Sequence, residues 1–157
     1  MKSTNLFRLF FAVTMLALLF AGTQTLLAQD SGVVTVQSKS SFDNTVESLR
    51  KMVAQNEMMV LAEIDHGKIL SMTGLKLNGI ALFVGNSVVG KQLFTANKAV
   101  GVAVPIRVNV YEEDDGKTYV NYVKPSSQLA PFANDQIKMV AQMLDEKLQA
   151  LTSMLAK

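Results

Sequence analysis

IRVNVYEEDDGKTYVNYV, residues 106–123, is the stretch of this chain that decides its fold. Two runs rich in β-branched and aromatic residues stand on either side of an acidic turn, which is the pattern of paired strands. The turn contains Asp115 and Gly116, a dipeptide that favours tight hairpins because both residue types tolerate positive φ angles. The stretch therefore predicts a β-hairpin, and so at least one antiparallel strand pair.

Shorter patterns around the hairpin predict further strands and helices. The other predicted strands cover 33–37, 57–64 and 80–84. Apolar residues three or four apart predict a helix over 42–55, a short helix within 86–97 and a long helix that begins at Asn134. Residues 67–78 are expected to form one or two helical turns, broken by Gly74. The apolar stripe of the terminal helix consists of Ile137, Val140, Leu144, Leu148, Leu151 and Leu155.

Strands and helices are interleaved along the chain, while the hairpin requires antiparallel pairing. This combination predicts an α+β fold with a single two-layer domain and a mixed or antiparallel sheet. The sheet would carry a C-terminal β-hairpin, with helices packed on it and a long amphipathic C-terminal helix. Pro105 precedes the hairpin and indicates an edge, a bulge or a strand start there.

The first 28 residues have the three-part layout of a secretory signal peptide. Lys2 and Arg8 form a basic start, and a largely apolar run over 9–21 follows. This run is shorter than the roughly 20 residues that a membrane-spanning helix needs, although an uncleaved anchor is the alternative. We predict cleavage after Ala28, a single domain over 29–157, and a periplasmic or secreted protein with no membrane span after cleavage.

Removal of that segment leaves a chain with no net charge. The whole sequence has 15 Lys and Arg against 13 Asp and Glu, and the loss of Lys2 and Arg8 makes 13 of each. A domain without net positive charge or a basic stripe lacks the electrostatic footprint of a nucleic-acid-binding protein. The chain has 0 Cys, so no disulfide is expected and the apolar core must hold the fold.

His66 is the single histidine, and it follows Asp65 at the end of a predicted strand. A carboxylate can orient an imidazole for proton transfer, so these two residues are the candidates for catalysis. Neighbours along a strand point to opposite faces, however, so adjacency alone does not make a catalytic pair. For His66, the favoured alternative is a strand-end residue that fixes a turn by hydrogen bonding.

Metal and cofactor chemistry has little support. A structural zinc site needs four Cys- or His-type ligands, which one His without Cys cannot supply. Thioethers can hold Cu(I), and Met139 and Met143 share a predicted helix face. They lie beside the leucine stripe, so they are expected to fill gaps in the core instead. We predict no metal site and no cofactor.

Two polar features remain as candidates for binding an anion. Gly85 and Asn86 follow a predicted strand, with Gly90 close behind, and such a turn can hold an anion with backbone N–H groups. It is not a P-loop, because Gln92 stands where Ser or Thr is needed. Arg107 lies within an apolar strand, where it must face solvent or pair with an acid.

Several short motifs follow one another in a characteristic order. They are Ile64-Asp65-His66, Leu82-Phe83-Val84-Gly85-Asn86, Val104-Pro105-Ile106-Arg107-Val108, Tyr111-Glu112, Gly116-Lys117, and Val120-Asn121-Tyr122 with Pro125. Their order and spacing resemble the family called domain of unknown function 302, over about 33–131. Ser87 departs from the family, which has Pro at that place. The resemblance implies a compact, self-associating α+β domain with no established reaction. It makes Asp65, His66, Gly85, Asn86, Arg107 and Tyr122 the first residues to consider for a site.

Export, zero net charge and the lack of a complete catalytic motif favour a non-enzymatic domain that binds a small molecule or an envelope protein. The Met- and Leu-rich terminal helix suits a partner, including a second copy of the chain in a homodimer. The predicted ligand-binding residues are Gly85, Asn86, Arg107 and Tyr122. The alternative is an enzyme or metal-handling protein that uses Asp65 and His66, with Arg107 holding an anionic group. That alternative predicts that His66 and Arg107 converge on one pocket.

Overall fold

A computed structural model describes residues 32–132 and 134–156, so the predicted signal segment lies outside the described residues. The strands are β1 (Val33–Gln37), β2 (Met59–Asp65), β3 (Gly79–Gly85), β4 (Ile106–Glu112) and β5 (Thr118–Val123). The helices are α2 (Phe42–Gln55), α3 (His66–Ser71), α4 (Ser87–Ala96), α5 (Pro125–Leu129) and α6 (Asp135–Leu155), with 3-10 turns η1 (Lys98–Val102) and η2 (Ala130–Phe132). The strands and the long helices expected from the sequence are present, within a few residues of their predicted bounds.

The five strands form one sheet in the order β1-β5-β4-β3-β2, and every neighbouring pair is antiparallel. The predicted α+β fold is therefore confirmed, in its antiparallel form. The predicted hairpin is β4 and β5, with Tyr111 opposite Tyr119. Gly116 has a φ of 77°, the positive value that the Asp-Gly turn was expected to require. Pro105 lies just before β4 and so marks a strand start.

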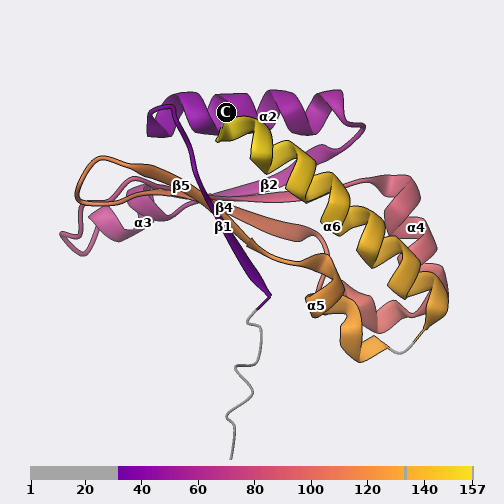
Figure 1. Ribbon diagram of the computed structural model, residues 1–157. Coiled ribbons are helices and arrows are strands. Elements are labelled where there is room, and N and C mark those ends of the chain that lie inside the picture. Colours follow the sequence, from indigo (N-terminus) through magenta and orange to yellow (C-terminus); the bar gives the residue numbers. More distant parts are fainter. Residues whose placement is uncertain (1–31, 133, 157) are drawn as a thin grey trace, which may run out of the picture. The chain divides into compact units, whose positions relative to one another are not determined.

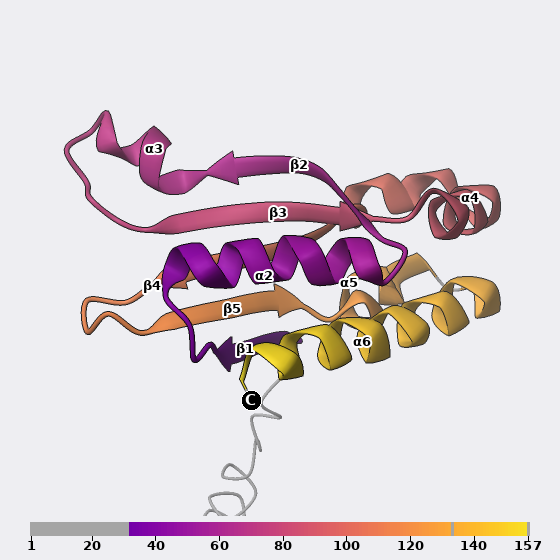
Figure 2. The same ribbon diagram turned by 90° about the horizontal axis from the view of Figure 1, so that it is seen from above.

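Both long helices, α2 and α6, lie on the same side of the sheet (Figure 1). Seen from above, α2 runs along the middle strands and α6 runs beside β1 (Figure 2). Apolar side chains fill the space between these two layers: Leu49, Leu82, Val108, Val120, Leu148 and Leu151 are each at most 1% exposed. Burial of a side chain of this size contributes about 1.5–3 kcal/mol, so this layer holds the fold together.

Asparagine side chains cap the N-termini of two helices, α4 and α6. Asn86 Oδ1 accepts hydrogen bonds from the backbone N–H groups of Val88 and Val89 at the beginning of α4. Asn134 Oδ1 does the same for Gln136 and Ile137 at the beginning of α6. Each cap satisfies donors that have no partner inside the helix. The helix start predicted at Asn134 is thus confirmed.

The opposite side of the sheet, which we call the open face, is made by the alternate residues of each strand. The residues of the open face are Val33, Thr35, Gln37, Met59, Ala62, Ile64, Gly79, Ala81, Phe83, Gly85, Arg107, Asn109, Tyr111, Tyr119, Asn121 and Val123. Most of them are half-buried or exposed, and Arg107 is the single charged residue among them. Neither of the two longest described helices covers this face (Figure 1).

The methionines of α6 correct one expectation from the sequence. Met139 is 65% exposed and Met143 is 44% exposed, so they do not fill gaps in the core. They lie on the outer side of α6, because Val140 and Leu144 occupy the side that faces the sheet. In the part of the chain that the structure describes, no helix is long and apolar enough to cross a membrane.

Candidate functional site

A hollow of about 440 Å³ on the open face, here called the open-face pocket, brings together polar side chains from four elements. Its lining consists of Val33, His66, Arg107, Asn109, Asn121, Tyr122, Val123 and Gln128. Arg107 and Asn109 are alternate residues of β4, and Asn121 stands opposite Asn109 on β5. The period of two along antiparallel strands therefore places these side chains on one face.

Arg107 supplies the positive charge of this pocket. It is exposed, and its guanidinium makes no ion pair or side-chain hydrogen bond among the described residues. Its strand neighbour across the sheet is Phe83, an apolar residue that offers no countercharge. A guanidinium has five N–H donors in a planar fork, which matches the two oxygens of a carboxylate. Arg107 is thus available to bind an anion.

Three amide side chains line the same pocket as this cation. Asn109 Nδ2 donates a hydrogen bond to Asn121 Oδ1 at 3.1 Å, which fixes the two amides relative to each other. Gln128 Nε2 donates to the backbone carbonyl of Val123 at 2.9 Å, which orients the Gln128 side chain at the pocket. The pair leaves the Asn121 Nδ2 donors and the Asn109 Oδ1 acceptor for a ligand. The pocket can therefore hold both a charge and a neighbouring polar group.

His66 enters the pocket from α3, and Asp65 does not. His66 is the first residue of α3, is half-buried and lines the same hollow as Arg107. Asp65 is the N-cap of α3, and its Oδ1 accepts a hydrogen bond from the backbone N–H of Lys68 at 2.8 Å. The Asp65 carboxylate thus fixes the turn after β2, whereas the turn-fixing role that the sequence favoured was predicted for His66 and stays a prediction.

Gly85 and Asn86 lie at a different place. Both border a smaller apolar hollow of about 170 Å³ between α4 and the ends of β3 and β4. Asn86 is the cap of α4, and its Nδ2 also donates to the backbone carbonyl of Glu57. A Cβ atom on Gly85 would stand 2.8 Å from Leu61 Cδ1, so the glycine allows a close approach. Both residues have structural roles.

Tyr122 borders the open-face pocket, but its ring belongs to the other side of the sheet. It pairs with Val108 in the register of β4 and β5 and is 4% exposed. The pKa of the Tyr122 hydroxyl is raised, mainly by burial. A hydrogen bond with the Thr152 side chain on α6 lowers this pKa in part, and the negative charge of Asp145 raises it further. The Tyr122 hydroxyl thus interacts with α6.

Sequence reasoning missed Asn109, Asn121 and Gln128. A signal was present for the first two, because polar residues at 107, 109 and 121 alternate with apolar residues in both hairpin strands. Gln128 had no signal, because it lies in the short helix α5 that no periodicity indicated. Among the described residues, no group of three or more His, Cys, Asp or Glu could hold a metal ion.

The fold and this site define a two-layer α+β domain with a polar pocket on its uncovered sheet face. The chain belongs to the family described as Domain of unknown function DUF302, whose model matches residues 34–155. A crystal structure of an uncharacterized conserved DUF302 protein from Bacillus stearothermophilus has a TM-score of 0.73 and 23% identity, and the match covers 78% of this chain and 97% of that one. This likeness shows the fold.

Curated relatives include two longer proteins. Fluoride-specific ion channel FluC 1 from Brucella suis biovar 1 (strain 1330) is 32% identical over 98 residues, which is 62% of this chain and 39% of the channel. The protein of the same name from Brucella abortus biovar 1 (strain 9-941) is also 32% identical over 98 residues, which is 62% of this chain and 36% of that protein. The chain thus spans well under half the length of these relatives.

Proposed function

We propose that this domain is a non-enzymatic binding protein that holds a small carboxylate-bearing molecule in the open-face pocket. The observation that carries the proposal is that the Arg107 guanidinium, which has no ion pair within the described part of the chain, lines one pocket with the hydrogen-bonded amides of Asn109 and Asn121. A hydrogen bond to a charged group is worth about 1.5–3 kcal/mol, so a carboxylate on Arg107 would supply most of the affinity.

The pocket's composition supports binding over catalysis. Among the described residues, its imidazole, His66, makes no ion pair with a carboxylate, and Asp65 is engaged with the backbone of α3. A triad-like site needs a base that a third group orients. His66 would instead donate or accept one more hydrogen bond to the ligand. The enzymatic alternative keeps one supporting feature, which is that His66 and Arg107 line the same hollow.

The proposed setting is the periplasm, after removal of the signal segment predicted over 1–28. The two Brucella relatives are named fluoride-specific ion channels, so fluoride is a further anion to test. The pocket offers groups for a larger ligand than a monatomic ion, since its amides stand beside the guanidinium. Fluoride is therefore expected to bind less tightly than a carboxylate.

Thermal unfolding of residues 29–157 with added acetate, succinate, benzoate or fluoride tests the proposal. We expect a saturable rise in Tm with at least one carboxylate, because a ligand that binds only the native state stabilises it. Arg107→Gln should abolish this rise, while Lys51→Gln, which removes a charge from the outer side of α2, should keep it. Equal rises in both variants, or no rise with any carboxylate, would contradict the proposal.

A second proposal is a homodimer in which two copies meet through their open faces. The observation that favours it is the near absence of charge on this face, where Arg107 is the single charged residue. Sheet faces that stay in water commonly carry polar and charged side chains at alternate positions. A neutral face fits a second neutral face better than it fits a charged partner.

The mass of the mature chain in solution tests the dimer. Ala62→Lys places a charge on the exposed edge of the open face, and Ala54→Lys places the same charge on the exposed side of α2. We expect a dimer for the natural chain and Ala54→Lys, and a monomer for Ala62→Lys. A monomeric natural chain at high protein concentration would refute the dimer without affecting the ligand proposal.

A further inference from the structure

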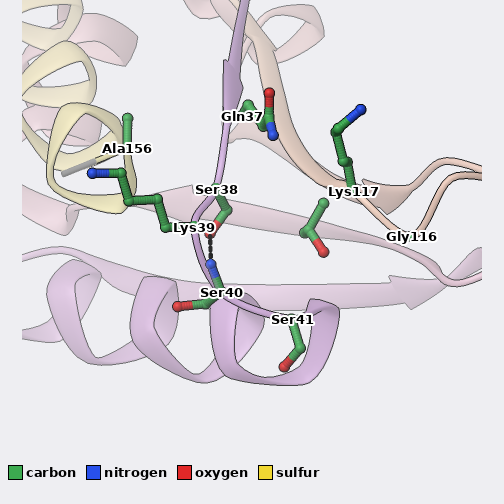
Figure 3. A pocket seen from close by; sticks show the side chains of 9 residues that line it. Gln37, Ser38, Lys39, Ser40, Ser41, Gly116, Lys117 and Ala156 are labelled. Atoms are coloured by element: carbon green, nitrogen blue, oxygen red, sulfur yellow. Dashed lines mark hydrogen bonds between the residues drawn. The ribbon is translucent and has the colours of Figure 1, made fainter.

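A second hollow lies at the other end of β1, at the loop that joins β1 to α2. Figure 3 shows its side chains, and its volume is about 690 Å³. The lining consists of Gln37, Ser38, Lys39, Ser40, Ser41, Gly116, Lys117, Thr118 and Ala156, and we call it the serine-loop pocket. It shares no residue with the open-face pocket. None of its lining residues is acidic, whereas two are lysines.

Thr118 is the residue that indicates a ligand here. Its side chain is 1% exposed, and its Oγ1 makes no hydrogen bond within the described part of the chain. The two neighbouring buried hydroxyls are bonded to each other, since Thr45 Oγ1 donates to Ser38 Oγ at 2.7 Å. Buried hydroxyl groups nearly always have a partner, because an unbonded one loses its interactions with water. A group bound in the hollow would supply the missing partner.

The beginning of α2 faces the same hollow. Ser41 is the N-cap of this 14-residue helix, and its side chain makes no capping hydrogen bond. The first N–H groups of a helix have no partner within it, and they carry a partial positive charge that attracts anions. Asp43 in the first turn competes for this charge but does not line the hollow. Within the described residues the Ser41 hydroxyl caps no backbone group, so this hydroxyl and these N–H groups can donate to an anion.

Two lysines stand at the rim. Lys117 is ion-paired with Asp115, whereas the Lys39 ammonium makes no ion pair among the described residues. Their side chains extend in different directions in Figure 3. Lysine side chains are long and flexible, which lets the ammonium groups move toward an anion between them.

We propose that the serine-loop pocket binds a phosphate group. The donors come from a buried hydroxyl of β5, the start of α2 and the lysines at the rim. A tetrahedral group with at least three acceptor oxygens meets donors from several directions better than a planar carboxylate does. The phosphate can be free or part of a phosphomonoester, since both present the same oxygens.

Titration of 15N-labelled residues 29–157 with inorganic phosphate, at constant ionic strength set by chloride, tests this site. We expect saturable shifts of the amide signals of Ser41, Phe42 and Thr118. Thr118→Val keeps the shape of the side chain and removes its unpaired hydroxyl, so we expect about tenfold weaker binding without loss of stability. Lys39→Gln should weaken binding, and Lys51→Gln should not.

Ser41→Gly provides a second variant, because glycine is accepted at an N-cap while the hydroxyl is lost. It is also expected to weaken phosphate binding. Glycerol phosphate distinguishes the two sources: a tighter affinity than that of inorganic phosphate indicates a phosphomonoester, and a weaker one indicates the free ion. Shifts that chloride alone reproduces, or full affinity in both Thr118→Val and Ser41→Gly, would overturn the proposal.

Discussion

The two faces of the sheet differ in chemistry although the same five strands make both. Leu82 and Val108, on the covered face, are fully buried, and their chain neighbours Phe83 and Arg107 stand on the open face. The covered face is mostly apolar, and two helices exclude water from it. The open face combines aromatic rings, amides and one guanidinium. The comparison shows that alternation along a strand separates the residues that hold this fold from those that can bind.

The largest expected effect separates two adjacent residues of β3. Leu82→Ala should lower the free energy of unfolding by about 3 kcal/mol, because it leaves a cavity in the closely packed layer under α2. Phe83→Ala removes a larger side chain from the half-buried open face, and should cost only about 1 kcal/mol. Urea unfolding in the Ala62→Lys background, which is expected to be monomeric, measures both. A similar cost for the two variants would mean that the open face is also part of the core.

Substitution of an asparagine that caps a helix should cost more stability than substitution of an asparagine that lines the open-face pocket. Asn86→Ala removes the cap of α4 and the bond to Glu57, and should cost about 2 kcal/mol of stability. Asn121→Ala removes one amide of the open-face pocket, and should cost about 0.5 kcal/mol while it weakens carboxylate binding. Unfolding and ligand titration together check the pair. Binding that stays intact in Asn121→Ala would remove this residue from the site.

A stacked pair of rings gives the open face its own small stabilisation. The Tyr111 and Tyr119 ring centroids are 5.6 Å apart with an interplanar angle of 23°. A double-mutant cycle with Tyr111→Ala and Tyr119→Ala should give a coupling energy of about 0.5–1 kcal/mol. The same cycle on Tyr111 and the distant Met139 serves as a control and should give no coupling. A coupling near zero for the tyrosines would show that the stack adds nothing to the strand pairing.

The smallest effect belongs to an ion pair at the edge of the covered face. Arg50 Nε and Glu63 Oε1 are 2.8 Å apart, and this hydrogen bond lowers the pKa of Glu63 more than its partial burial raises it. The pair's contribution is therefore present above the ordinary glutamate pKa of about 4.3, and is lost as the pH falls through the lowered value in the folded chain.

Because both side chains are more than a third exposed, Glu63→Gln should cost less than about 1 kcal/mol at neutral pH. This cost should shrink toward zero in acid. Glu47→Gln, on the exposed helix pair with Lys51, is the matched control and should show a smaller cost. A cost for Glu63→Gln that does not change with pH would show that the carboxylate charge is not what stabilises this edge.

The sequence predicted the fold better than it predicted the site. Local patterns were enough for the hairpin, for α2 and for the Asn134 start of α6, because each depends on neighbouring residues. Whether Met139 and Met143 are buried depends on how wide the apolar stripe of α6 is. The spacing of apolar residues along the helix does not determine this width. The candidate site residues lie in two different hollows, which the order of the sequence motifs also could not predict. Gly85 and Asn86 belong to a motif that precedes that of Arg107, but they line a hollow beside α4, whereas Arg107 lines the open-face pocket.

The most direct test of the open-face pocket is the response of its own side chains to a ligand. Succinate added to 15N-labelled residues 29–157 should move the Arg107 Nε signal and the Asn109 and Asn121 side-chain amide signals with one shared affinity. Signals of the covered face should stay in place. Absence of a saturable shift at Arg107, or the same amide shifts in Arg107→Gln, would contradict the account.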